Sequence, residues 1–188
     1  MTIRSALLVV LCSAMLFGGF AATSGSRDGL PGRSGNDVSP FRERVAAYTQ
    51  LRQEIIARLL ENGIDSNADY GREFRNQLAA AIREARRQSQ PGEIFCAEVA
   101  GYMRRVVWDT LRGEQEILAD VPEVPNLRVN DFYPEGEPLA SVPVSLLQRL
   151  EPLPQELQYR FLATALILLD IDTALIVDFL PNAIPRSS

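Results

Sequence analysis

The hydrophobic periodicity of the chain changes at Gly113, and that change limits the folds that it can adopt. Before Gly113, apolar residues recur every three or four positions, which indicates amphipathic helices. After Gly113 the helical period disappears, seven prolines interrupt residues 122–154, and short apolar runs follow from residue 157 onward. A helical first half followed by a strand-forming second half favours an α+β fold.

Three helices are expected before Gly113. The first begins at Ser39-Pro40, with Ser39 as N-cap and the proline at the first helical position, and ends near Gly63. The second covers roughly residues 69–88, and the third roughly residues 93–112. Their inward stripes are Phe41, Val45, Tyr48, Ile55 and Leu59, then Tyr70, Phe74, Leu78, Ile82 and Ala85, then Phe95, Val99, Met103 or Tyr102, Val106 and Leu111.

Three strands are expected near the C-terminus, at residues 157–163, 165–170 and 174–180. They are so apolar that the sheet should be buried on both faces or nearly so. The sequence therefore predicts a layer of about three N-terminal helices packed on one face of a small antiparallel C-terminal sheet. Alternation over residues 127–133 predicts a further strand, and residues 144–150 predict one or two helical turns.

The N-terminus has the three parts of a secretory signal peptide. Arg4 precedes an uncharged apolar run over residues 6–20, and the small residues Ala21 and Ala22 follow it. We expect residues 1–22 to be the signal peptide, residues 23–39 a Gly- and Ser-rich flexible linker, and residues 40–188 a single α+β domain. The alternative is an uncleaved membrane anchor, because residues 5–22 just reach the length that spans a bilayer.

The chain contains no histidine and no lysine, since all 19 basic residues are arginine. Histidine triads, histidine-ligated metal sites and lysine-based catalysis are therefore excluded. Residues 41–112 carry a net charge of +2 and residues 113–188 a net charge of −8, so neither part has the basic excess of a nucleic-acid binder.

Two short motifs resemble known sites but lack the residues that would complete them. Residues 65–69 give D-x-N-x-D, the start of a calcium loop, yet Tyr70 and Asn76 stand where Gly and a bidentate carboxylate are needed. Asp172-Thr173 followed by Ala174 is similar to an aspartic-peptidase signature, but only 16 residues follow Asp172. We expect no metal and no cofactor, and we interpret Asp172 and Thr173 as turn residues.

Several carboxylates are candidates for a catalytic pair, although no spacing singles out two of them. Surface solvation is the simpler interpretation for all except Asp178, which interrupts an apolar strand and needs a partner if it is buried. We expect Arg160, on a neighbouring strand, to be that partner. Cys96 is expected to be a buried thiol without a base. The candidate acids are Glu93, Glu98, Asp131, Glu135, Glu137, Asp170 and Asp178.

Several segments resemble a group of uncharacterised exported bacterial proteins of about this size. The resemblance covers roughly residues 41–185 and is most specific over the last forty residues, where residues 153–161, 166–170 and 175–182 carry it. Residues 91–95 and 133–135 are further points of similarity. The group has no assigned activity. The resemblance therefore implies export and a shared fold, and it supplies no functional residue.

Together these observations favour a periplasmic or secreted domain that works by non-catalytic binding to a protein or an envelope component. One alternative is a carboxylate-dependent hydrolase acting on envelope material, which needs a concave pocket holding two carboxylates of raised pKa. The other is a membrane-tethered accessory subunit, if the leader is not cleaved. A binding module is expected to show an exposed apolar patch or an open sheet edge.

Overall fold

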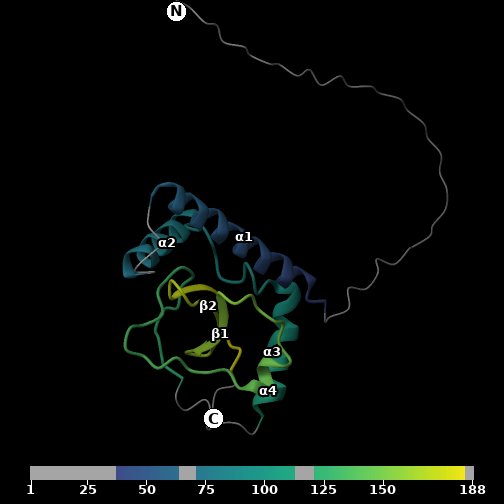
Figure 1. Ribbon diagram of the computed structural model, residues 1–188. Coiled ribbons are helices and arrows are strands. Elements are labelled where there is room, and N and C mark those ends of the chain that lie inside the picture. Colours follow the sequence, from purple (N-terminus) through teal and green to yellow (C-terminus); the bar gives the residue numbers. More distant parts are fainter. Residues whose placement is uncertain (1–36, 64–70, 113–120, 185–188) are drawn as a thin grey trace, which may run out of the picture. The chain divides into compact units, whose positions relative to one another are not determined.

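The computed structural model describes residues 37–63, 71–112 and 121–184, in which helices precede a three-stranded sheet (Figure 1). All of these residues belong to one compact unit. The expected signal peptide and most of the expected linker, like the calcium-type residues 65–69, lie outside the described residues.

Three long helices form where the apolar stripes predict them. They are α1 (Ser39–Glu61), α2 (Arg72–Ala85) and α3 (Ala97–Leu111). The predicted cap of α1 is wrong by one residue: Val38 is the N-cap, and Ser39 donates its amide to Asp37 Oδ1 at 3.0 Å. The helix ends as expected before Gly63, whose φ of +76° suits a residue without a Cβ.

The third helix begins later than its periodicity suggests. It starts at Ala97, after a loop over residues 91–96 that opens on Pro91-Gly92. Gly92 has a φ of +86°, and this left-handed turn keeps the loop out of the helix. Consequently the backbone amides just before α3 are free to bind another part of the chain.

The sheet is an antiparallel meander of β1 (Leu157–Leu162), β2 (Ala165–Asp170) and β3 (Leu175–Leu180), in the order β1-β2-β3. Leu168 pairs with Asp178 and Leu169 pairs with Ile176, so Val177 is an extra residue in β3. Such a bulge bends the strand and changes the face that the following side chain occupies. It places Asp178 beside Leu168 on the helix side of the sheet.

Both faces of the sheet are buried, as the apolar runs predict. The helices cover one face in the larger core, which includes Phe41, Leu78, Val99, Phe161 and Leu168. The second face carries a smaller core covered by the irregular segment that contains Val124, Leu127 and Val129 (Figure 1). The predicted layout of N-terminal helices packed on a small antiparallel sheet is confirmed.

Irregular segments also line the two outer strands. The predicted strand over residues 127–133 is wrong: this segment forms only a bridge between Phe132 and Leu175, although Asn130 donates to Ile176 O at 2.8 Å. At the other edge, Ser141 bridges to Arg160. The expected helical turns shorten to α4 (Val144–Leu147), and its Leu146 is fully buried.

Candidate functional site

Within the described ranges, Asp178 is bound by backbone amides and not by a side chain. Its carboxylate is fully buried, and Oδ2 accepts hydrogen bonds from the amides of Ile94 (2.6 Å) and Phe95 (2.8 Å). Oδ1 accepts from the amides of Gly92 and Phe179, both at 2.8 Å. Burial raises the pKa of this carboxyl, while the four hydrogen bonds oppose that rise. Asp178 therefore connects β3 to the loop before α3.

The expected ion pair between Asp178 and Arg160 is wrong. Arg160 pairs with Ile167 across β1 and β2, and Ile167 pairs with Phe179, the residue after Asp178. Because successive side chains of a strand point to opposite faces, Arg160 and Asp178 lie on opposite sides of the sheet. Arg160 instead donates to Gln158 Oε1 at 2.5 Å.

The interpretation of Asp170 as a solvated surface acid is wrong: Asp170 is the second fully buried carboxylate, and side chains of α1 satisfy it. Its Oδ2 accepts from the Tyr48 hydroxyl at 2.8 Å and from Arg52 Nε at 2.9 Å. Burial, and then the neighbouring Asp170 carboxylate, raise the pKa of Tyr48. Asp170 therefore anchors α1 to the end of β2, and the sequence did not single out Arg52 as its partner.

The segment after Asp170 is the turn that its residue types predict. Asp170 Oδ1 accepts from the backbone amides of Asp172 (3.2 Å) and Thr173 (3.1 Å). Asp172 also forms an ion pair with Arg52 Nη2. The interpretation of Asp172 and Thr173 as turn residues is confirmed.

The remaining candidate acids do not form a buried pair. Glu98, Asp131, Glu135 and Glu137 are exposed, and Glu93 is half-buried near Arg86. No group of three or more acidic or cysteine side chains within the described ranges is arranged to hold a metal ion. Cys96 is buried as expected, and its burial raises the pKa of the thiol.

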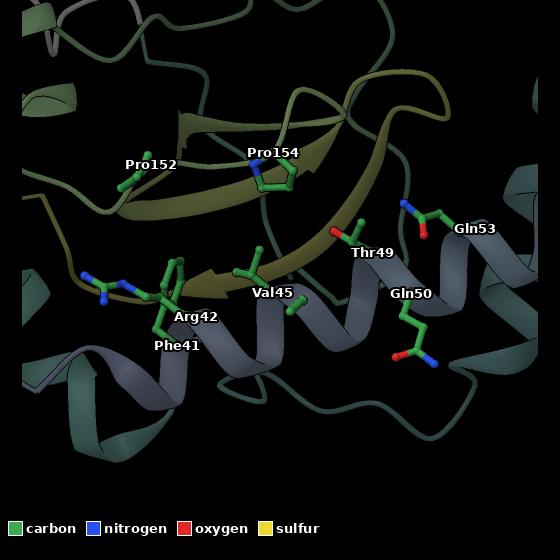
Figure 2. Close-up of a pocket in the computed structure, with 9 residues that line it drawn as sticks. Phe41, Arg42, Val45, Thr49, Gln50, Gln53, Pro152 and Pro154 are labelled. Carbon is green, nitrogen blue, oxygen red and sulfur yellow. The ribbon is translucent and has the colours of Figure 1, made fainter.

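The largest of three cavities that we describe is a groove between α1 and the segment after α4 (Figure 2). We name it the α1 groove; its volume is about 580 Å³. Proline disfavours helical backbone in the residue before it, so the alternating Pro152 and Pro154 hold this segment extended along α1. Leu153 between them packs against the core. The groove is lined by Phe41, Arg42, Val45, Ala46, Thr49, Gln50, Gln53, Pro152 and Pro154.

The α1 groove is lined mainly by apolar residues, and its uncharged polar lining residues are Thr49, Gln50 and Gln53. Figure 2 shows Val45 and Thr49 pointing from α1 toward Pro154. Thr49 Oγ1 is buried and has no hydrogen-bond partner in the described part of the chain. Arg42, the one charged residue among the described lining residues, pairs with Glu151 Oε2 at 2.5 Å. The groove therefore suits an uncharged ligand with both apolar and amide groups.

Two smaller cavities contain charged residues. One, of about 490 Å³, is polar and lies between the end of α2 and residues 129–131, with Arg83, Glu84 and Arg87 in its lining. The other, which we name the Arg86 cavity, has a volume of about 290 Å³. Its lining residues are Arg44, Ala47, Tyr48, Leu51, Arg86, Glu93 and Ile94.

The buried carboxylates and the cavities are in different places. Asp170 and Asp178 line none of the three cavities, and the acids that do, Glu84, Glu93 and Asp131, are exposed or half-buried. Apart from the closely spaced prolines at 152 and 154, no sequence pattern indicates the α1 groove. Apolar periodicity reports which residues face the core, and it does not report where two surfaces leave a gap.

No family model, no curated protein and no solved structure matches this chain. Among the described residues, no helix combines the length and the apolar character needed to cross a membrane.

Proposed function

We propose that this chain is an exported, non-catalytic binding domain of the cell envelope, and that the α1 groove takes an extended peptide segment of a partner protein. The observation that carries the proposal is the composition of this groove. Phe41, Val45 and the two prolines supply an apolar surface, and Thr49 supplies a hydroxyl without a partner in the described part of the chain.

A peptide fits these groups better than a charged ligand does. An extended chain presents alternate side chains to an apolar surface and leaves backbone groups free for hydrogen bonds. Gln53 lines the groove with an amide, which can both donate and accept hydrogen bonds, whereas the Gln50 amide already donates to Glu54 Oε1 at 3.0 Å. Arg42, the cation of the described lining, is already paired with Glu151.

The sheet edges are weaker candidates for the binding surface. β1 is bridged to Ser141, and β3 exchanges hydrogen bonds with the segment at Asn130 and Asp131. A partner strand would have to displace these segments before it could pair with the sheet. The hydrolase alternative has less support, because the two buried carboxylates line none of the three cavities.

The proposal can be tested by selecting peptides and then blocking the groove. A random dodecapeptide display library is panned on the immobilised chain, and enriched peptides are synthesised and titrated against it. Ala46 lines the groove, so Ala46→Trp should fill it and weaken peptide binding at least tenfold. Ala57→Trp is the matched control, since Ala57 is exposed on the same helix and lines none of the three cavities.

Enriched peptides that bind the Ala57→Trp variant normally and lose affinity for the Ala46→Trp variant support the proposal. A selection that enriches no peptide, or peptides that bind both variants equally, overturns it. Circular dichroism of both variants confirms that they are folded before the titration.

A further inference from the structure

The Arg86 cavity lies on the other side of α1 from the α1 groove. Helical residues advance by about 100° each, so Arg44, Tyr48 and Leu51 face away from the groove residues Ala46 and Gln53. Within the described ranges, the two cavities share no lining residue. A ligand in one cavity would therefore touch none of the residues that line the other.

Arg86 is a buried cation with incomplete partners. The residue is 8% exposed, and its guanidinium lies 5.1 Å from the centre of the Tyr48 ring. Its Nη1 is buried and has no hydrogen-bond acceptor within the described ranges. Its Nη2 reaches Glu93 Oε2 only at 3.5 Å, which is longer than a charge-assisted hydrogen bond. A buried guanidinium normally requires a close, two-pronged carboxylate partner.

Glu93 occupies part of the space that such a carboxylate would take. Its side chain is 43% exposed, and its Oε1 accepts from the Gln90 amide at 2.9 Å. Partial burial tends to raise the pKa of Glu93, but hydrogen bonds from Ser89 and the Gln90 amide, together with Arg86, outweigh it and leave the pKa below its ordinary value. Glu93 is therefore held toward its own loop, and only its second oxygen approaches Arg86.

The rest of the cavity is cationic at its mouth and apolar on its walls. Arg44 is exposed, and it donates from Nη1 to the backbone carbonyl of Glu93. Two arginines face one glutamate, which leaves a net charge of +1 on the described lining. Ala47, Leu51 and Ile94 supply the apolar walls. A volume of about 290 Å³ suits a small ligand.

We propose that the Arg86 cavity binds a carboxylate that carries a short branched apolar group, with the carboxylate replacing Glu93 at Arg86. A guanidinium and a carboxylate form two parallel hydrogen bonds, which would satisfy both Nη atoms. The apolar group lies against Leu51 and Ile94, and Arg44 lies at the entrance. A free short-chain acid and the C-terminal residue of a peptide present this same chemistry.

The test is a titration followed by nuclear magnetic resonance of the ¹⁵N-labelled chain. The probes are 3-methylbutanoate for the free acid and N-acetyl-glycyl-valine for the peptide end, each with its uncharged amide as control. Saturable shifts of the Glu93 and Ile94 amides are expected with the carboxylates and not with the amides. Tighter binding of the dipeptide identifies a peptide terminus as the ligand, and tighter binding of 3-methylbutanoate identifies a free acid.

Three variants distinguish specific binding at the Arg86 cavity from non-specific electrostatic attraction of the carboxylates. Arg86→Gln should weaken binding at least tenfold, whereas Arg87→Gln, at the exposed neighbouring arginine, should leave it unchanged. Glu93→Gln should tighten binding several-fold, because it removes the competing charge. This third variant also decides the outcome if Arg86→Gln does not fold.

The proposal is overturned if neither carboxylate gives saturable shifts or if the amides bind equally well. It is also overturned if Arg87→Gln weakens binding as much as Arg86→Gln, or if Glu93→Gln leaves the affinity unchanged. The α1 groove is untouched by these variants, so a negative result here leaves the peptide proposal standing.

Discussion

Two buried carboxylates on the helix-covered face of the sheet are satisfied in different ways. At the end of β2, Asp170 is satisfied by Tyr48 and Arg52, two side chains one turn apart on α1. Within β3, opposite Leu168, Asp178 is satisfied by backbone amides of Gly92, Ile94 and Phe95. The first arrangement depends on which side chains are present, whereas the second depends on the path of a loop.

This difference decides what each site tolerates. A side-chain pair can be replaced by two apolar groups, because both partners leave together. Backbone amides cannot be removed, so the carboxylate that satisfies them has no apolar substitute. Asp178 should therefore be the less replaceable of the two aspartates.

Asp178→Ala is expected to have the largest effect on stability. It leaves three loop amides buried without an acceptor, and each unsatisfied donor costs about 1–3 kcal/mol. We expect the free energy of unfolding to fall by about 4–6 kcal/mol in urea denaturation.

The control for this prediction is Arg160→Ala, on the opposite face of the sheet. We expect it to cost less than about 1 kcal/mol, and the two losses should add within about 0.5 kcal/mol in the double variant. A coupling energy well above that value would show that Arg160 and Asp178 interact after all.

Substitutions in the Asp170–Arg52 pair should have the next largest effect on the free energy of unfolding, and the effects of the two substitutions should be coupled. Asp170→Ala and Arg52→Met are each expected to cost about 3 kcal/mol, because each leaves a buried charged group without its partner. The double variant should cost about 1–2 kcal/mol less than the sum of the two, measured by urea denaturation. Strictly additive losses would mean that Asp172 or solvent replaces each missing partner.

Gly92 and Gly101 give a matched pair of smaller effects with opposite signs. Gly92→Ala forces a Cβ into a backbone with a φ of +86°, and we expect it to cost about 1–2 kcal/mol. Gly101 lies within α3, where a Cβ would meet no atom of another described segment within 4 Å. Gly101→Ala should therefore stabilise the fold by about 0.5–1 kcal/mol. Thermal unfolding of both variants measures this, and a neutral Gly92→Ala would show that the loop does not need its left-handed turn.

The smallest expected effect is the pH dependence contributed by Asp178. Burial raises its pKa above the ordinary value of 3.8, so the folded chain binds this proton more tightly than the unfolded chain. The contribution of Asp178 to the free energy of unfolding should therefore fall as the pH rises from 3.8 to the raised pKa, and it should be constant above that pKa. The difference in stability between the native chain and Asp178→Asn, followed from acid to neutral pH, measures this contribution. A difference that grows with pH in favour of the native chain would contradict the stated direction.

Much of the fold is predictable because burial leaves a periodic trace. The stripe of Phe74, Leu78 and Ile82 predicts α2, and the apolar residues of β2 predict a strand buried on both faces. The start of α3 is less predictable, because Phe95 fits the helical period although it belongs to the preceding loop. The apolar pattern of the sequence does not distinguish a buried residue within a helix from a buried residue in the loop next to that helix.

The sequence by itself determined the order of the elements and excluded catalysis and metal binding that require histidine or lysine. It also indicated that Asp178 needs a partner if it is buried. Only the tertiary structure decided what that partner is. The bulge at Val177 sets the face on which Asp178 lies, and Gly92 turns the loop amides toward it. Backbone amides are common to almost every residue, so no sequence pattern marks the ones that will be used. The sequence does not predict the α1 groove or the Arg86 cavity either, because each forms only where segments that are distant in the sequence come together.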